Sequence, residues 1–171
     1  MKIQAAVTRE KGKIAIETVE LAEPKAGEVL VKMIASGICH TDTVVIEQYL
    51  PVVFPVVAGH EGVGVVEKVG PGVQSLAPGD RVVLTYPSCG VCSNCQNAHP
   101  YSCDDNFNML FGGKYRDGTT RMTTEDGKEI STMFMQSSFA TYTVANQDNT
   151  IKVDVDTEDL KKLCSLGCGV Q

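Results

Sequence analysis

The sequence has no long apolar segment and no surplus of positive charge. No stretch approaches the roughly 18 consecutive apolar residues of a membrane span, and residues 1–20 mix charged with apolar side chains, unlike a secretory leader. The net charge is -6 and the isoelectric point is near 5.0, so we expect no basic surface for a phosphate backbone. These absences predict a cytoplasmic protein that binds neither nucleic acid nor membranes.

The sequence also has no Gly-x-Gly-x-x-Gly motif between a strand and a helix, the fingerprint of a dinucleotide-binding fold. Its nearest match, at Gly59, Gly62 and Gly64, has a different spacing and lies among β-prone residues, where it indicates turns and close packing. The chain has 171 residues, of which 43% are hydrophobic and 21% charged. This predicts one globular domain over residues 1–171.

Short β-branched runs alternate with Gly and Pro turns from Lys2 to about Val83. Their spacing leaves no room for intervening helices, which favours a barrel or sandwich over a parallel sheet with helical crossovers. Asp-Gly pairs at 117–118 and 126–127 predict hairpins. The expected strands include residues 14–16, 29–34, 62–69 and 81–84, with a second β segment ending at 139–144.

Only the C-terminal tail is predicted to be helical. Thr157 is the expected N-cap, two acidic residues follow it, and apolar residues recur at helical spacing in positions 160, 163 and 164. Gly167 or Gly169 is expected to end this helix. The predicted fold class is therefore mainly β with one C-terminal helix.

Seven cysteines are present, and four of them form the pattern Cys89-x2-Cys92-x2-Cys95-x7-Cys103. In a reducing cytoplasm, metal binding or catalysis explains such a cluster better than a disulfide framework. A folded loop can close four thiolates around zinc at about 2.3 Å each, leaving no open position. We therefore expect a structural zinc in a lobe of about residues 88–110, whose binding energy folds the loop.

Two other interpretations of the four cysteines remain. An iron–sulfur cluster also takes closely spaced cysteines, but its usual bacterial run has a shorter last gap and a Pro after the fourth cysteine, whereas Asp104 follows here. The cysteines could also be buried or disulfide-linked without a ligand. Four within fifteen residues make this second interpretation the weaker one.

Two of the three histidines lie beside acids in Gly-containing segments, Cys39-His40-Thr41-Asp42 and His60-Glu61-Gly62. A metal-ligating imidazole usually passes its other N–H to a neighbouring acceptor, and nearby carboxylates offset the cation's charge. Taken alone, each segment fits a loop histidine without a metal.

Together, these segments, the four-cysteine pattern and the terminal Leu166-Gly167-Cys168-Gly169 resemble zinc-containing medium-chain alcohol dehydrogenases over the whole chain. Within that family the sequence is most similar to the aryl-alcohol (benzyl alcohol) dehydrogenases. That subfamily similarity is carried by residues 84–85, 136–142, 149–150 and 167–171.

The resemblance implies a GroES-like β-barrel catalytic domain with a zinc-binding lobe, and a separate NAD-binding Rossmann domain that these residues do not contain. It also implies a catalytic zinc held by Cys39, His60 and Cys168, the Cys2His set that alcohol dehydrogenases use. Two thiolates and a neutral imidazole leave the metal formally neutral, with a fourth position for water or alcohol. Up to two zinc ions per chain are thus expected.

By the same resemblance, the zinc lowers the pKa of the alcohol, and hydride transfer to NAD gives an aldehyde. The expected substrate is a primary alcohol and, on the subfamily similarity, an aromatic one. Thr41 corresponds to the family's hydroxyl beside the reacting oxygen, Asp42 to the acid on His60 and Glu61 to the acid behind the metal. His40 occupies the place of a residue near the cofactor pyrophosphate.

One departure from the family concerns the proton relay. Many members end it in a histidine five residues after the first cysteine ligand, where this chain has Val44. The proton must then leave through the cofactor ribose and water, or through His40.

Several residues have competing interpretations. Cys164 lies about one helical turn from Cys168 and could also face the zinc, but the family motif favours Cys168, leaving Cys164 as a small buried side chain. His99 is expected in a solvated loop. Leu50, Phe54 and Tyr86 are candidates for an apolar substrate pocket, with core packing or loop anchoring the better expectation for each.

Two functions from different classes follow. The first is the catalytic part of a zinc- and NAD-dependent alcohol dehydrogenase, inactive by itself. The second is a stand-alone zinc-stabilised β domain, binding or chaperonin-like, without catalysis, which would not need Cys39, Thr41, His60 and Cys168. The Gly-Val-Gln end, just past a ligand, favours a longer enzyme. Such an enzyme would be a homo-oligomer, although these residues alone can be monomeric. The sequence does not decide which alcohol is the substrate, or whether the cofactor is NAD or NADP.

Overall fold

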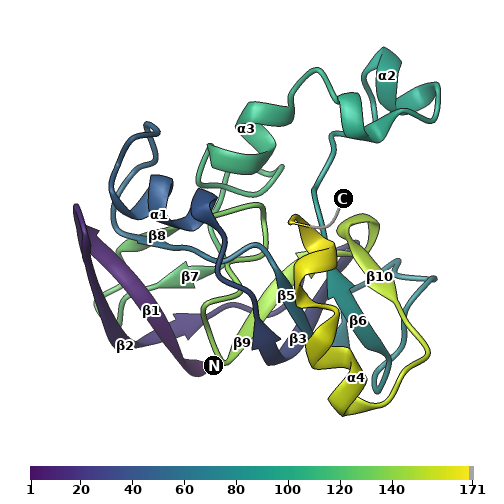
Figure 1. The fold of residues 1–171 in the computed structure, drawn as a ribbon, viewed down its shortest axis with the longest axis horizontal. Helices are drawn as coiled ribbons and strands as arrows, with labels where there is room; N and C mark the ends of the chain where they lie inside the picture. The colour runs from purple at the N-terminus through teal and green to yellow at the C-terminus, as the bar shows by residue number, and fades with distance from the viewer. Residues whose placement is uncertain (170–171) are drawn as a thin grey trace.

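The structure, a computed structural model, describes residues 1–169 and consists mainly of two five-stranded sheets (Figure 1). The first closes into a barrel with strand order β1-β2-β7-β8-β4, and the second has the order β10-β6-β5-β3-β9. The strands are β1 Lys2–Glu10, β2 Lys13–Leu21, β3 Glu28–Ser36, β4 Val56–Val57, β5 Gly62–Val69, β6 Arg81–Leu84, β7 Met122–Thr123, β8 Glu129–Thr132, β9 Tyr142–Asn146 and β10 Thr150–Lys152.

Apolar side chains of the two sheets form separate cores. In β1, buried residues alternate with more exposed ones from Ile3 to Val7, and the antiparallel partner β2 adds Val19 and Leu21 to the same core. A separate core is formed by valines and leucines of β3, β5 and β6, such as Val31, and by Ala145 of β9. The alternation expected for a sheet with one covered face is therefore present in β1, whereas residues 28–31 of β3 are all buried, because Leu30 belongs to the first core and Val31 to the second.

The predicted strands are confirmed at residues 14–16, 29–34, 62–69 and 81–84, which lie in β2, β3, β5 and β6. The Asp-Gly pair at 126–127 forms the turn between β7 and β8, with Gly127 at a φ of 82°. The pair at 117–118 also forms a turn, closed by the Tyr115 N–H on the Thr119 carbonyl. That turn joins no two strands, so the hairpin prediction is wrong there.

The expectation that only the tail is helical is wrong. Asp42 accepts a hydrogen bond from the backbone N–H of Cys39 at the N-terminus of α1, and α3 buries Met109 and Leu110. Both helices are too short to show helical periodicity in the sequence. The helices are α1 His40–Ile46, α2 Ser93–Gln96, α3 Asn106–Phe111 and α4 Thr157–Lys162, with 3-10 helices η1 Pro100–Ser102, η2 Gln147–Asn149 and η3 Cys164–Gly167.

The tail helix α4 differs at both ends from the prediction. Its N-cap is Asp156, whose side chain accepts from the backbone N–H of Asp159, and Thr157 is already the first helical residue. The α-helix ends at Lys162, before either expected glycine, because the chain tightens into η3 through i+3 hydrogen bonds such as Leu166 N–H to Leu163 O. α4 packs against β3, β5 and β6.

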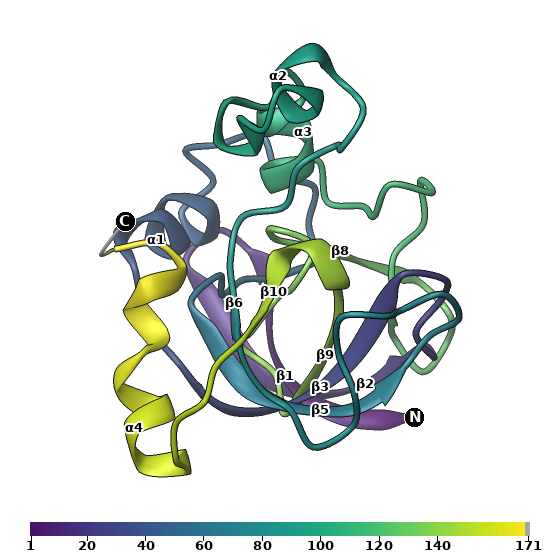
Figure 2. The same ribbon diagram turned by 90° about the vertical axis from the view of Figure 1, so that its right-hand side faces the viewer.

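The segment 88–105 forms a lobe that projects away from both sheets and carries α2 (Figures 1 and 2). Within this lobe Cys103 is the one buried residue. The helices that the structure describes within residues 1–169 are all too short or too polar to cross a bilayer.

Candidate metal centres

In the lobe, the Sγ atoms of Cys89, Cys92, Cys95 and Cys103 all lie within 4.8 Å of one another. The Cys89 and Cys95 sulfurs are 3.9 Å apart, close to the roughly 3.8 Å edge of a tetrahedron of sulfurs about 2.3 Å from a zinc. A disulfide would need about 2.05 Å, and all seven cysteines are free thiols. The donor set therefore fits a tetrahedral metal.

Backbone N–H groups point at two of these sulfurs. The Cys92 N–H donates to Cys89 Sγ at 3.3 Å, and the Cys89 N–H donates to Cys103 Sγ at 3.3 Å. Hydrogen bonds from the backbone of Val91 and Cys92 lower the pKa of Cys89 to about 6, whereas burial raises the pKa of Cys95 to about 11. The backbone thus favours the thiolate of Cys89, the form that binds metal.

A second cluster joins three parts of the chain. Cys39 immediately precedes α1, His60 and Glu61 precede β5, and Cys168 follows η3, yet one ligand atom from each of the four lies within 4.8 Å of all the others. The Cys39 and Cys168 sulfurs are 4.0 Å apart, again close to the edge of a zinc tetrahedron.

Asp42 fixes two members of this cluster. Its Oδ1 lies 3.0 Å from His60 Nδ1 and accepts the Gly59 N–H at 2.9 Å, while Oδ2 accepts the Cys39 N–H at 2.9 Å. A carboxylate at Nδ1 selects the tautomer with its proton there, which leaves the lone pair on Nε2. His60 Nε2 is buried and has no hydrogen-bond partner. An unpartnered buried acceptor beside two sulfurs fits a bound cation.

The pKa values of His60 and Cys39 are shifted by their neighbours in this cluster. Burial alone would lower the pKa of His60, but the hydrogen bond and charge of Asp42 outweigh it and raise the pKa. Burial would raise the pKa of Cys39, but hydrogen bonding with Thr41 and the charge of the nearby His60 imidazole lower it below its ordinary value.

The close approach of Cys168 to Cys39 and His60 depends on Gly167. A Cβ on Gly167 would lie 2.5 Å from the Leu84 carbonyl oxygen and 3.2 Å from that of His60, so a side chain there would push the terminal turn away. Beyond the cysteine, the Gly169 N–H donates to Glu61 Oε1 at 2.9 Å. Glu61, which is 4% exposed, therefore lies at the cluster and also holds the backbone that follows Cys168.

An aromatic wall covers one side of the cluster. The Phe134 ring lies 4.5 Å from the His60 ring and 5.3 Å from the Tyr86 ring, measured between centroids. The Tyr86 hydroxyl donates to Cys168 Sγ at 3.0 Å. Sequence reasoning placed Tyr86 in packing or a pocket and missed this bond, which joins residues 82 positions apart and leaves no local signal. Leu50 and Phe54 are partly buried against a neighbouring apolar cluster.

The other predicted residues differ in their distance from the cluster. Thr41 Oγ1 lies 3.7 Å from Cys39 Sγ, whereas His40 is exposed at the start of α1 and Val44 is partly buried. Cys164 is buried with an apolar cluster that includes Leu160, outside the metal-binding group. His99 is exposed on the lobe, as predicted.

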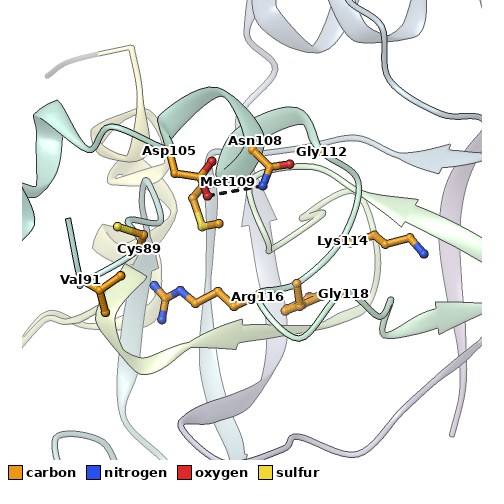
Figure 3. Close-up of a pocket in the computed structure, with 10 residues that line it drawn as sticks. Cys89, Val91, Asp105, Asn108, Met109, Gly112, Lys114, Arg116 and Gly118 are labelled. Carbon is orange, nitrogen blue, oxygen red and sulfur yellow. Dashed lines mark hydrogen bonds between the residues drawn. The ribbon is translucent and has the colours of Figure 1, made fainter.

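A cavity of about 440 Å³ lies between the lobe and α3 (Figure 3). Its charged lining groups already have partners, because Arg116 pairs with Asp148 and Lys114 with Glu129. Of the eight clustered metal-ligand candidates, only Cys89 lines it. This cavity is therefore separate from the Cys39–His60–Cys168 centre.

The chain is similar to known proteins in both sequence and structure. The alcohol dehydrogenase GroES-like domain family matches residues 25–155. The geraniol dehydrogenase of Castellaniella defragrans is 45% identical over 170 residues, which cover 98% of this chain and 45% of that protein.

Two crystal structures are also similar. An alcohol dehydrogenase zinc-binding domain protein from Burkholderia ambifaria has a TM-score of 0.94 at 46% identity, covering 99% of this chain and 46% of that one. The benzyl alcohol dehydrogenase of Acinetobacter calcoaceticus has a TM-score of 0.90 at 40% identity, covering 99% and 45%. The chain thus spans less than half the length of each of these relatives.

Proposed function

The chain belongs to the alcohol dehydrogenase GroES-like domain family, and from that premise we propose that it is the catalytic domain of a zinc-dependent dehydrogenase that oxidises a primary alcohol to an aldehyde. The observation that carries the proposal is the buried, unpartnered Nε2 of His60 beside two cysteine sulfurs. A stand-alone binding domain would have no use for such a group, because burying it without a partner costs about 1–3 kcal/mol.

The residues that would hold the zinc are Cys39, His60 and Cys168. Two thiolates and one imidazole leave a fourth position. Zinc held there would supply a Lewis acid that polarises the alcohol oxygen. Asp42 keeps the imidazole in the tautomer that such binding requires, and the Glu61 carboxylate lies within 4.8 Å of the three donor atoms.

We assign Thr41 to proton transfer because its Oγ1 is the hydroxyl next to Cys39 Sγ. It can accept the proton of the substrate hydroxyl and pass on its own. Val44, one turn further along α1, offers no group to continue this path. The exposed His40 on the same helix, or solvent water, would then receive the proton.

The hydride acceptor in this proposal is NAD, which would bind to a nucleotide-binding domain outside the described residues. Within residues 1–169 no strand–glycine-loop–helix unit of a dinucleotide fold is present. His40, exposed beside the centre, would face the cofactor pyrophosphate.

For the substrate, we propose a primary alcohol whose hydroxyl-bearing carbon is attached to an unsaturated carbon. Geraniol and benzyl alcohol, the substrates in the names of two relatives, share that feature. The aromatic wall of Phe134 and Tyr86 beside His60 suits a flat, unsaturated group.

A pair of cysteine variants tests the proposal. Cys168→Ser should remove one zinc per chain, because a serine hydroxyl is a poor, largely protonated replacement for a thiolate. In a protein that joins this chain to its nucleotide-binding domain, the same change should abolish alcohol oxidation. Zinc content and NADH formation with benzyl alcohol are the measurements.

The matched control is Cys164→Ser, which should keep both zinc ions and activity at a cost of about 1–3 kcal/mol in stability, since a hydroxyl replaces a buried thiol. Loss of zinc in Cys164→Ser with full retention in Cys168→Ser would mean that the terminal ligand is misassigned by one turn. Unchanged zinc and activity in both would rule out the proposed centre.

A further inference from the structure

The sulfur atoms of the two metal centres receive hydrogen bonds from different kinds of donor. In the lobe, Cys89 and Cys103 accept backbone N–H groups that come with the loop itself. Cys168 Sγ instead accepts the phenolic O–H of Tyr86 at 3.0 Å, a side chain that lies beyond the end of β6.

We propose that Tyr86 is a positioning residue for the catalytic metal: its hydroxyl orients the Cys168 thiolate and withdraws charge from that sulfur. The inference rests on the function proposed above. A thiolate has no proton to donate, so when Cys168 is ionised the hydrogen bond can run in one direction only, from the phenol to the sulfur.

The Tyr86 ring is held where this role requires it. It packs at 5.3 Å against Phe134, which packs at 4.5 Å against His60. The Tyr86 hydroxyl contacts one proposed ligand, Cys168, while its ring packs through Phe134 against another, His60. Displacing the ring would therefore disturb both Cys168 and His60.

Cys168 needs such a partner more than the other two ligands do. Asp42 fixes both Cys39 and His60 by hydrogen bonds. Cys168 lies at the end of a 3-10 turn, where its own N–H makes a long bond of 3.2 Å to the Ser165 carbonyl. The Tyr86 hydroxyl thus supplies the side-chain anchor that Asp42 gives the other ligands.

The charge effect follows from the two sulfurs being 4.0 Å apart. Two thiolates at that distance repel each other. A hydrogen bond to the Cys168 sulfur reduces this repulsion, and it also reduces the charge that the sulfur donates to the metal. Hydrogen bonds to ligating sulfurs tune metal centres in this way. A sulfur that donates less charge leaves the metal a stronger Lewis acid toward the alcohol.

The test uses cadmium-113 as the probe metal and compares Tyr86→Phe, which keeps the ring, with the wild-type protein. Two cadmium NMR signals are expected, one from the four-thiolate lobe and one from the two thiolates and imidazole. In Tyr86→Phe the second signal should move downfield, because the Cys168 sulfur donates more charge, while the lobe signal stays fixed as an internal reference. A chelator competition should show about 10-fold weaker retention of metal at that centre, because the loss of the hydrogen bond that orients Cys168 outweighs the stronger donation by its sulfur.

Tyr49→Phe serves as the matched control, since Tyr49 is 72% exposed and lies outside both clusters. Both of its cadmium signals should coincide with those of the wild type. Coincidence of all signals in Tyr86→Phe as well would overturn the role of Tyr86 and leave the proposed function standing. A wild-type protein with the lobe signal alone would instead overturn the catalytic metal centre, and this inference with it.

Discussion

The barrel and the lobe are stabilised in opposite ways. The barrel buries a continuous set of apolar side chains, among them Ile3, Val19 and Ile130, each 4% exposed or less. In the lobe, residues 88–105, only Cys103 is buried, and the short helix α2 has no buried residue. A loop with no apolar core cannot offset the conformational entropy of ordering it. We therefore propose that the sheets can fold without metal, whereas the lobe depends on it.

A buried ion pair joins the two sheets. Arg121, which precedes β7 of the barrel, donates to both carboxylate oxygens of Glu28, the first residue of β3, and their side chains are 2% and 5% exposed. The Arg121 guanidinium also lies 4.4 Å from the centre of the Tyr115 ring. Charge is therefore compensated by protein groups between the sheets, while in the lobe four thiolates would be compensated by a cation.

The largest effect on structure is expected when the lobe loses one of its four cysteine ligands. Cys95→Ser removes one of four thiolates, and structural zinc contributes on the order of 10 kcal/mol to the folding of such loops. Backbone amides of residues 88–105 should lose their protection from hydrogen exchange, while those of β3 and β5 keep theirs. Mass spectrometry of exchanged peptides would show this; equal loss of protection in β3 and β5 would mean that the two regions fold as one unit.

The next largest effect is expected for the Arg121–Glu28 ion pair between the sheets. Arg121→Met leaves Glu28 buried without a partner and should lower the free energy of unfolding by about 3–5 kcal/mol. Urea unfolding measures it. The matched control is Arg116→Met, whose partner Asp148 is 40% exposed and whose loss should cost less than about 1 kcal/mol. Similar costs for both variants would show that burial of the pair is unimportant.

The smallest effect concerns Asp117 at the edge of this pair. Burial would raise its pKa, but hydrogen bonds from Lys25, Thr119 and Arg121 outweigh it and hold the pKa well below its ordinary value. A depressed carboxylate pKa stabilises the fold above the unfolded value of about 3.9, and this contribution is lost as pH falls through the folded pKa.

Asp117→Asn should therefore destabilise the protein by up to about 1 kcal/mol at pH 7, a limit set by the 39% exposure of the side chain. The gap between wild type and variant should narrow as pH falls below 4. Denaturant unfolding across this range measures it, and a gap that does not change with pH would contradict the ion-pair explanation.

The contrast between barrel and lobe also explains what could be predicted from the sequence. The four lobe cysteines come from one short stretch, so their spacing alone indicated a common ligand. Long strands such as β3 and β5 could be predicted because their sequences contain runs of β-branched residues. The family resemblance was confirmed by the comparisons, and the structure brings Cys39, His60 and Cys168 together as that resemblance implied. Their roles as ligands remain proposals.

Contacts between distant segments could not be predicted in this way. The two-residue strands β4 and β7, which complete the barrel, are too short to show alternation. The N-cap of α4 is Asp156 and not the expected Thr157, because both residue types can cap a helix and only the backbone conformation decides between them. The bond from Tyr86 to Cys168 exists only because the terminal turn folds back over β6.

We propose that one chain holds a closed structural zinc and an open catalytic zinc, and metal analysis of the purified protein can distinguish the two sites. Zinc, iron and acid-labile sulfide would be measured in the wild type and in Cys168→Ser. We expect close to two zinc ions in the wild type, close to one in the variant, and neither iron nor sulfide in either. Iron together with sulfide, or less than one zinc in the wild type after gentle purification, would overturn the assignment of the two zinc sites.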